Sequence, residues 1–328
     1  MPRFLVPALI LTALVLSGAL GCAEPAHRES RWALMGTQAS AQVYTRTESG
    51  AEDALSRIHR ALEKVEGAMS NRQTESELSR LNLEAAHGPF KVQDPDLYRC
   101  IRMALAYARA TDGAFDPTVG PLMGWRKVEL MEVARALRFS EAGVELDLGG
   151  IVEGYALDVA ARVFARVGCQ SGLLELGDSL YAWNHPPHKP SWTVKIPDPE
   201  DGSRLMATLE LASRALATSS KGRPARSDVI AATTIADSGA DADAFSTALL
   251  VAGSKRGSEF LQRARRVEAV LLVRGREGPS LLVSASLKGN LEVAPEFHEK
   301  IGGRVRYLLP PLSLEGSGEI DLWERLVN

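Results

Sequence analysis

Asp147 and Glu153 stand on either side of a glycine pair, Gly149-Gly150, within residues 144–158 (VELDLGGIVEGYALD). Apolar and acidic residues alternate before the pair, which predicts a half-buried strand, and apolar residues recur at helical spacing after it. A strand, a glycine turn and a helix start let backbone groups approach a phosphate or a metal ion closely. This stretch is the first candidate site, although a solvated strand-to-helix connection would have the same local pattern.

Residues 242–247 (ADAFST) carry an acid and a hydroxyl four positions apart, Asp243 and Thr247. At the start of a helix these two side chains lie on the same face and present their oxygen atoms together. An isolated pair of this kind most often caps a helix. Its assignment to a metal or a ligand therefore depends on the other motifs of the chain.

Residues 111–122 (TDGAFDPTVGPL) contain two glycines and two prolines, which prevent regular secondary structure. Phe115, Val119 and Leu122 are apolar, so we expect an ordered loop that is pinned to the core. Residues 70–82 (SNRQTESELSRLN) are polar instead, and among them Ser76 has the chemistry of a helix cap.

The composition is that of a soluble globular protein, since 45% of the 328 residues are hydrophobic and 24% are charged. This length allows one large or two ordinary domains with a buried core. The formal net charge of -3 argues against nucleic acid as a main partner. Outside the N-terminus, no apolar run reaches the roughly eighteen residues that a membrane-spanning helix needs.

Residues 1–22 have the pattern of a secretory signal peptide, with Arg3, an apolar run and small residues before a break. Residues 17–22 (SGALGC) also resemble a bacterial lipoprotein processing site, in which Cys22 becomes the lipidated first residue. We therefore expect an exported protein, lipid-anchored on the periplasmic or extracytoplasmic face of a bacterial membrane. Soluble periplasmic export is the alternative. Residues 23–31 are expected to form a tether.

Hydrophobic spacing predicts the helices and strands, and their order predicts the fold class. Because they occur without a βαβ rhythm, we expect an α+β fold. The last part of the chain, residues 286–328, is expected to be an extension of unknown role after a domain over residues 32–285. The predicted helices cover residues 51–69, 95–110, 151–167, 240–252 and 256–265. The predicted strands cover residues 39–43, 144–148, 172–180 (with a Gly177-Asp178 turn), 192–196, 206–211, 229–235, 267–273 and 280–284.

Cys100 and Cys169 are the two cysteines that follow the predicted signal peptide. An oxidising compartment would permit one disulfide between them. Both lie in or just after a helical pattern, however, which favours two buried free thiols. Two cysteines with no neighbouring histidine exclude a cysteine-rich zinc site.

Five separated segments together resemble the ApbE family of bacterial, usually lipid-anchored FAD:protein FMN transferases. They follow the order and approximate spacing of that family, and the resemblance covers roughly residues 32–285. It implies an ApbE-like α+β fold related to the T-fold, with mixed sheets and packed helices in a single large domain. The segments are residues 35–37, 70–82, 111–122, 147–158 and 242–247.

The resemblance implies Mg²⁺-dependent transfer of the FMN half of FAD to a Thr or Ser hydroxyl of an acceptor protein, with AMP leaving. Splitting a pyrophosphate needs a cation near the leaving oxygens, and Mg²⁺ prefers hard oxygen ligands. By resemblance, the metal ligands are the carbonyl of Gly150 and the side-chain oxygens of Asp243, Ser246 and Thr247. The flavin contacts carry over to Met35, Arg72, Ala114, Phe115, Asp116, Asp147 and Glu153.

Three of these residues have a second interpretation or differ from the family pattern. Phe115 is as well suited to anchor its loop in the core as to contact the flavin. Arg72 stands where family members often have a tyrosine, so any stacking there would be by a guanidinium group. Glu153 stands where many members have a lysine and some a glutamate.

The main departure from the family lies between Thr218 and Asp243. Family members have a His-x-x-Asp-Pro-x-Thr-Gly segment there, whose histidine is expected to handle the acceptor's proton. This sequence has only SSKGRPARSD over residues 219–228, and none of its six histidines falls in the window. His185 and His188, in a proline-rich loop, could replace it, but solvent-exposed loop histidines are the commoner case.

Three hypotheses for function follow. The first is an active FAD:protein FMN transferase with FAD as substrate, Mg²⁺ as cofactor and an acceptor protein as partner. The second is a catalytically impaired relative that binds flavin or metal, or acts as a scaffold lipoprotein. The third is hydrolysis of FAD to FMN and AMP, with water in place of the protein hydroxyl.

Overall fold

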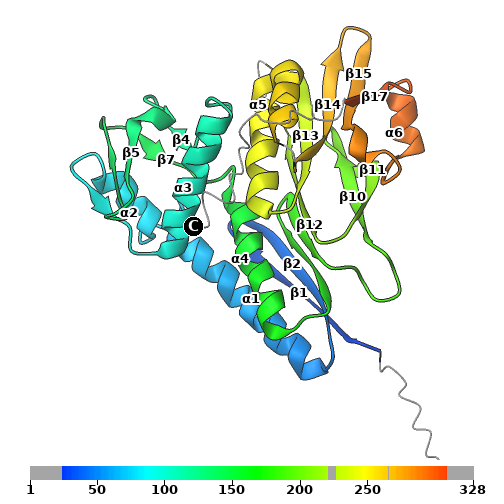
Figure 1. Ribbon diagram of the computed structural model, residues 1–328, viewed down its shortest axis with the longest axis horizontal. Coiled ribbons are helices and arrows are strands. Elements are labelled where there is room, and N and C mark those ends of the chain that lie inside the picture. Colours follow the sequence, from blue (N-terminus) through cyan, green and yellow to red (C-terminus); the bar gives the residue numbers. More distant parts are fainter. Residues whose placement is uncertain (1–23, 221–226, 265, 309–328) are drawn as a thin grey trace, which may run out of the picture.

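A nine-stranded sheet is the largest layer of the computed structural model, which describes residues 24–220, 227–264 and 266–308 (Figure 1). Neighbouring strands are antiparallel, except that the last two in the sheet order run parallel. The order is β1 (Ala26–Leu34), β2 (Thr37–Thr45), β8 (Ser171–Leu176), β9 (Ser179–Trp183), β12 (Arg214–Ser220), β13 (Val229–Ala236), β14 (Glu268–Gly275), β15 (Gly278–Ser284) and β17 (Val305–Leu308).

Three long helices cover one face of this sheet. Helix α1 packs on β1 and β2, α4 packs on β8 and β9, and α5 packs on β12 and β13. Adjacent helices also pack on each other, α1 against α4 and α4 against α5 (Figure 1). Their bounds are Glu48–Met69 for α1, Val152–Val167 for α4 and Gly239–Arg263 for α5.

A smaller sheet covers the opposite face. The apolar side chains of its two long strands share one buried cluster with residues of β12 to β15. Helix α6 (Pro295–Lys300) closes this layer through the buried side chain of Phe297. The strands are β10 (Trp192–Asp198), β11 (Asp201–Leu211) and β16 (Leu291–Val293).

A second lobe lies beside α4, on the left in Figure 1. It contains the remaining helices and two small sheets, one of three strands and one of two. Its elements are α2 (Glu77–Glu84), α3 (Pro95–Ala110), β3 (Phe90–Lys91), β4 (Thr118–Val119), the 3-10 helix η1 (Trp125–Lys127), β5 (Val128–Met131), β6 (Ala136–Phe139) and β7 (Glu145–Leu146).

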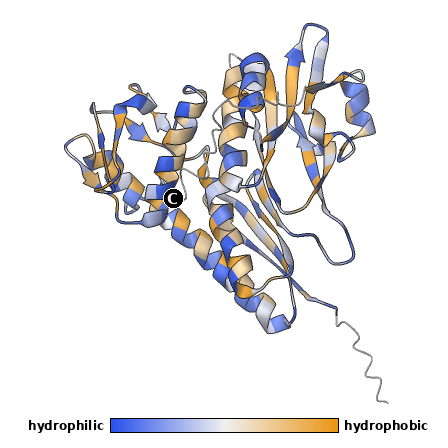
Figure 2. Ribbon diagram, viewed as in Figure 1, coloured by the Kyte–Doolittle hydropathy of each residue, from blue (hydrophilic) through white to orange (hydrophobic). Residues whose placement is uncertain are grey.

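The helix α1 shows how the hydrophobic pattern sets the packing. Its buried residues recur every three or four positions, and Figure 2 shows hydrophobic and hydrophilic residues interspersed along its length. The Thr47 hydroxyl caps its N-terminus by accepting from the amide of Gly50 at 3.1 Å. One face of the helix can therefore pack on the sheet and on α4 while the other faces solvent.

Helices α4 and α5 meet at a pair of glycines. A Cβ atom added to Gly154 of α4 would overlap the backbone carbonyl of Gly239 in α5, and one added to Gly239 would overlap the carbonyl of Gly154. Glycine is required at both positions, because the two helix backbones approach without side chains between them.

Most of the predicted elements are confirmed. The helix over residues 95–110 is α3, Ser76 caps α2, and the Gly177-Asp178 turn joins β8 to β9. The two predicted C-terminal helices form the single element α5, interrupted at Gly253, whose φ is 81°. Cys100 and Cys169 are free and buried as predicted, and burial raises the pKa of both thiols.

The predicted tether was wrong where the structure describes it, because residues 26–31 belong to β1. This strand pairs with β2 along its whole length, and its Trp32 ring stacks on His59 of α1 at 4.9 Å. β1 is the edge strand of the sheet, so its polar residues face solvent and hide the strand pattern in the sequence.

The predicted domain end at residue 285 was also wrong. The chain continues through η2 (Ala285–Leu287), β16 and α6 to β17, which pairs with β15. Phe297 and Ile301 are buried in the core beneath these elements. The described part of the extension is therefore part of the domain, and residues 309–328 lie outside the described residues.

The strand predicted over residues 144–148 is shorter than expected. β7 covers only Glu145–Leu146, because Asp147 leaves the pairing to begin the glycine turn. Its amide donates to the carbonyl of Pro117 at 2.8 Å, and its carboxylate accepts from the amide of Gly149 at 2.8 Å.

The predicted signal peptide and Cys22 lie outside the described residues. Within the described part of the chain, no helix is both long and apolar enough to cross a membrane.

Substitution of Gly154 by alanine tests the contact between α4 and α5. We expect Gly154→Ala to lower the free energy of unfolding by about 1–3 kcal/mol or to prevent folding, because the added methyl group forces two helix backbones apart. Gly67→Ala is the matched control: this helical glycine has no neighbour within 4 Å, and the change should stabilise by about 0.5–1 kcal/mol. Denaturant unfolding measures both, and equal stability of Gly154→Ala and the unaltered protein would contradict the prediction.

Candidate active site

Asp243 lies in the first turns of α5 and is fixed by α4. Its carboxylate accepts from the backbone amide of Gly154 at 3.1 Å, and the residue is only 7% exposed. Burial, together with the nearby carboxylates of Glu153, Asp158 and Asp178, raises the pKa of Asp243 to about 7, although the Gly154 amide lowers it. A buried carboxylate among other carboxylates is a site that a bound cation would stabilise.

The glycine turn lies directly against the next turn of α5. A Cβ atom placed on Gly150 would stand 3.1 Å from the Thr247 hydroxyl oxygen and 3.1 Å from the ring of Phe115. The structure therefore brings together one residue from each of three predicted motifs. Phe115 is 2% exposed and packs edge-on to the Tyr107 ring, which supports its interpretation as the anchor of its loop.

Three hydroxyl groups gather beside Asp243. The Ser246 hydroxyl donates to the Asp243 carbonyl at 2.8 Å and lies 2.7 Å from the Ser219 hydroxyl. Ser219 comes from the end of β12, and its oxygen is also 3.3 Å from that of Thr247. Ser246 and Thr247 are predicted site residues, whereas Ser219 is not, and its only signal in the sequence is the hydroxyl-rich stretch 218–220.

The N-terminus of α5 is held by a buried polar network. Asp158 accepts from the amides of Gly239 and Ala240 at 2.6 and 3.0 Å, and Ser238 caps the helix. Tyr107 donates to Asp241 at 2.5 Å, and so does Ser238 at 2.9 Å. These groups satisfy amides that a buried helix end would otherwise leave unpaired. Asp158 stands at the end of the 147–158 motif, and its role in capping α5 has no signal in the sequence.

Glu153 faces the turn between β8 and β9. A Cβ atom on Gly177, whose φ is 57°, would stand 2.6 Å from a carboxylate oxygen of Glu153, so this turn requires glycine. Burial and the neighbouring Asp178 carboxylate raise the pKa of Glu153 to about 7, although the Asp178 amide donates to it. The side chain is therefore held next to the Asp243 site.

Met35 and Arg72, two predicted flavin contacts, lie together. A Cβ atom on Gly36 would overlap the Arg72 guanidinium, and the Met35 amide donates to Glu66 at 3.0 Å. The turn that contains Met35 joins β1 to β2, and the carbonyl of Gln38 accepts from the Gly177 amide. The β1–β2 turn therefore lies at the same end of the strands as the β8–β9 turn and Glu153.

The predicted flavin contacts Ala114, Asp116 and Asp147 lie in loops that lead into the glycine turn. Asp116 accepts from the hydroxyl and amide of Thr118 and from the Trp125 amide, so its carboxylate orders its own loop. Ala114 is buried, and Asp147 bonds within the turn. All three residues therefore lie in the framework around the glycine turn.

The donors at this site fit a hard cation such as Mg²⁺. Asp243 would offer a carboxylate, Thr247 a hydroxyl and Gly150 a backbone carbonyl, all of them oxygen donors. In the described ranges, no group of three or more His, Cys, Asp and Glu side chains is arranged to hold a metal. A cation here would depend on one carboxylate together with hydroxyl and carbonyl oxygens.

His185 and His188 do not replace the missing histidine. They follow Trp183, the last residue of β9, whereas the Gly177-Asp178 turn precedes the first residue of the same strand. The two histidines therefore lie beyond the opposite end of β9 from the site.

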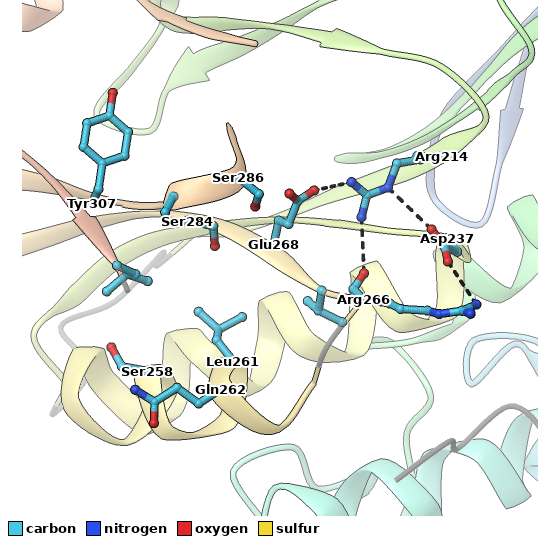
Figure 3. A pocket seen from close by; sticks show the side chains of 13 residues that line it. Arg214, Asp237, Ser258, Leu261, Gln262, Arg266, Glu268, Ser284, Ser286 and Tyr307 are labelled. Atoms are coloured by element: carbon cyan, nitrogen blue, oxygen red, sulfur yellow. Dashed lines mark hydrogen bonds and ion pairs between the residues drawn. The ribbon is translucent and has the colours of Figure 1, made fainter. Parts of the chain in front are cut away.

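A pocket of about 610 Å³ lies elsewhere, between the end of α5 and strands β14, β15 and β17 (Figure 3). None of the predicted site residues lines it. Its two arginines are neutralised by carboxylates, Arg214 by Glu268 and Asp237, and Arg266 by Asp237. We place the candidate site at Asp243 instead, because the motif residues and the raised pKa values occur together there.

Comparison with known proteins agrees with this fold. The sequence model of the ApbE family matches residues 35–223 and 220–271, so the chain belongs to the ApbE family. The two matched parts meet at residues 220–223, within the window where the family's histidine segment is expected to be missing.

Two curated relatives are both named FAD:protein FMN transferase. The protein from Treponema pallidum is 23% identical over 299 residues, covering 73% of this chain and 82% of the relative. The protein from Vibrio cholerae is 26% identical over 277 residues, covering 70% and 82%.

Solved structures confirm the α+β fold. The flavin transferase ApbE from Vibrio cholerae superposes with a TM-score of 0.73 at 22% identity, over 80% of this chain and 99% of that one. The ApbE protein from Thermotoga maritima gives 0.72 at 23% identity, over 81% and 99%.

The raised pKa values of Glu153 and Asp158 predict a pH-dependent stability without divalent cations. Both acids have a folded-state pKa of about 7, above the ordinary values of 4.5 and 3.8, so the folded chain binds more protons between those limits. Stability should therefore fall as pH rises from about 4.5 to about 7. Thermal unfolding in a chelating buffer should show a smaller fall for Glu153→Gln, with the exposed Glu145→Gln as control. An unchanged pH slope in Glu153→Gln would contradict the prediction.

Proposed function

We propose that this chain is an FAD:protein FMN transferase that uses Mg²⁺ at Asp243, Thr247 and Gly150. The observation that supports it most is the contact between the glycine turn and Thr247, which brings two motifs about a hundred residues apart into one site. Membership of a family whose curated relatives carry this activity supports the same function.

In the proposed reaction, an acceptor hydroxyl attacks the phosphorus atom of the FMN half of FAD. A bond forms between that phosphorus and the acceptor oxygen, and the bond from the phosphorus to the bridging oxygen breaks. AMP leaves with the bridging oxygen, and the hydroxyl proton passes to solvent. A cation bound at the site would neutralise charge that develops on the leaving oxygens.

The residues of this chain hold and orient these groups. Asp243 is kept in place by the Gly154 amide, and the absence of a side chain at Gly150 lets Thr247 and Phe115 pack directly against the turn. Ser246 is fully buried, its proton is engaged by the Asp243 carbonyl, and its oxygen is engaged by the Ser219 hydroxyl at 2.7 Å. We therefore assign Ser246 to the support of the site rather than to direct contact with the cation.

The acceptor is proposed to be a protein modified on a Thr or Ser hydroxyl. The predicted lipidation of Cys22 would hold the enzyme on the extracytoplasmic face of a bacterial membrane, where exported acceptors are accessible. Soluble export remains the alternative. These two proposals rest on the sequence pattern alone.

The missing histidine segment favours one other function, in which the chain binds flavin or metal and transfers nothing. A positioned general base typically contributes about 10²–10⁴-fold, so its loss would slow the chemical step by that order. The proposed transferase is therefore expected to be slow, and hydrolysis of FAD by water is the third outcome of the same assay.

The test incubates residues 23–328 with FAD, Mg²⁺ and an acceptor that carries a flavinylation motif. A fluorescent acceptor band in a denaturing gel is expected. It should disappear with a chelator and with Asp243→Ala, because both remove the cation, and persist in the exposed-surface control Asp53→Ala. FAD binding with a dark acceptor band would contradict transfer and support the binding relative. Release of FMN and AMP without labelling would indicate hydrolysis.

A further inference from the structure

Of the three hydroxyl residues beside Asp243, namely Ser219, Ser246 and Thr247, only Ser219 does not come from α5. It lies near the end of β12, where its hydroxyl oxygen is 2.7 Å from that of Ser246 and 3.3 Å from that of Thr247. Nothing in the family motifs gave it a role here. Its position between the buried Ser246 and the proposed metal ligand Thr247 indicates a role.

The direction of these hydrogen bonds follows from counting protons. A hydroxyl group has one proton to donate and lone pairs to accept with, whereas a carbonyl only accepts. Ser246 must therefore donate its one hydrogen bond to the Asp243 carbonyl, at 2.8 Å. In its bond with Ser219 it can only accept, so Ser219 is the donor.

The same count extends to Thr247. Ser219 donates its only hydroxyl hydrogen bond to Ser246, so in its contact with Thr247 it can only accept. Thr247 is then the donor, so this contact leaves its lone pairs unused. The Gly150 turn lies close to the same oxygen, since a Cβ atom on Gly150 would be 3.1 Å from it. The chain of donors runs from Thr247 through Ser219 and Ser246 to a backbone carbonyl.

We propose that Ser219 is a positioning residue. It accepts the hydrogen bond that the Thr247 hydroxyl donates, and so leaves the lone pairs of that hydroxyl free for a bound divalent cation. The inference rests on the proposed function, since the cation is the Mg²⁺ of that site. It adds to the site a residue that does not touch the cation itself.

The strand holds Ser219 firmly enough for this role. Ser219 pairs with Ala232 of β13, and the amide of the preceding Thr218 donates to the Asp178 carbonyl at 3.0 Å. Helix α5 packs on β12, so the Ser219 side chain faces α5. Ser220 is the next residue on the same strand and is exposed, because successive side chains of a strand point to opposite faces.

The test measures binding of Mn²⁺ alone to the chain without FAD or acceptor, by the loss of the electron paramagnetic resonance signal of free Mn²⁺. Residues that orient a metal ligand typically contribute about 10–100-fold to affinity, so Ser219→Ala should raise the Kd for Mn²⁺ by that factor. Ser219→Thr keeps the hydroxyl and suits a strand, so it should restore most of the affinity. Ser220→Ala is the matched control and should bind as the unaltered chain does.

Thermal unfolding of each variant separates this effect from a loss of fold. If Ser219→Ala unfolds at the temperature of Ser220→Ala and binds Mn²⁺ equally well, the inference is wrong while the metal site of the proposed function stands. Failure of Ser219→Thr to restore binding would also overturn it. If the unaltered chain binds no Mn²⁺, both the inference and the proposed metal site are wrong.

Discussion

Gly154 and Gly239 bring the backbones of α4 and α5 into direct contact, and the position of Asp243 depends on that contact. With no side chain between the helices, the Gly154 amide reaches the Asp243 carboxylate at 3.1 Å. The same approach lets Asp158 of α4 accept from the first amides of α5. A larger residue at either glycine would separate the helices and so remove the carboxylate from the glycine turn that completes the site.

The part of the site that the structure describes concentrates acidic side chains around Asp243. The charged side chains that shift the pKa of Asp243 are all acidic, and burial makes their repulsion stronger. Such an arrangement costs stability in the isolated chain, as functional sites often do. A divalent cation bound by oxygen ligands would relieve the repulsion and would bring a charge suited to a pyrophosphate. The electrostatics and the family membership thus agree on the same chemistry.

The sequence predicted features that depend on local pattern and missed those that depend on distant contacts. Helix α3, the Ser76 cap and the Gly149-Gly150 turn follow from spacing and residue type, and the motif resemblance located Asp243 and Thr247. The sequence predicts a tether where β1 begins, because the polar residues of this edge strand face solvent. Ser219 meets Ser246 across 27 positions, and Tyr107 meets Asp241 across 134. No local pattern reveals such partners, and only the fold shows that they belong to the site.

The position of a bound cation tests this account most directly. A crystal of the full chain soaked in Mn²⁺ should show one anomalous peak bounded by the Asp243 carboxylate, the Thr247 hydroxyl and the Gly150 carbonyl. That result would establish that the contact between α4 and α5 builds a metal site from two distant motifs. A peak held by other carboxylates, with these three oxygens left uncoordinated, would contradict it.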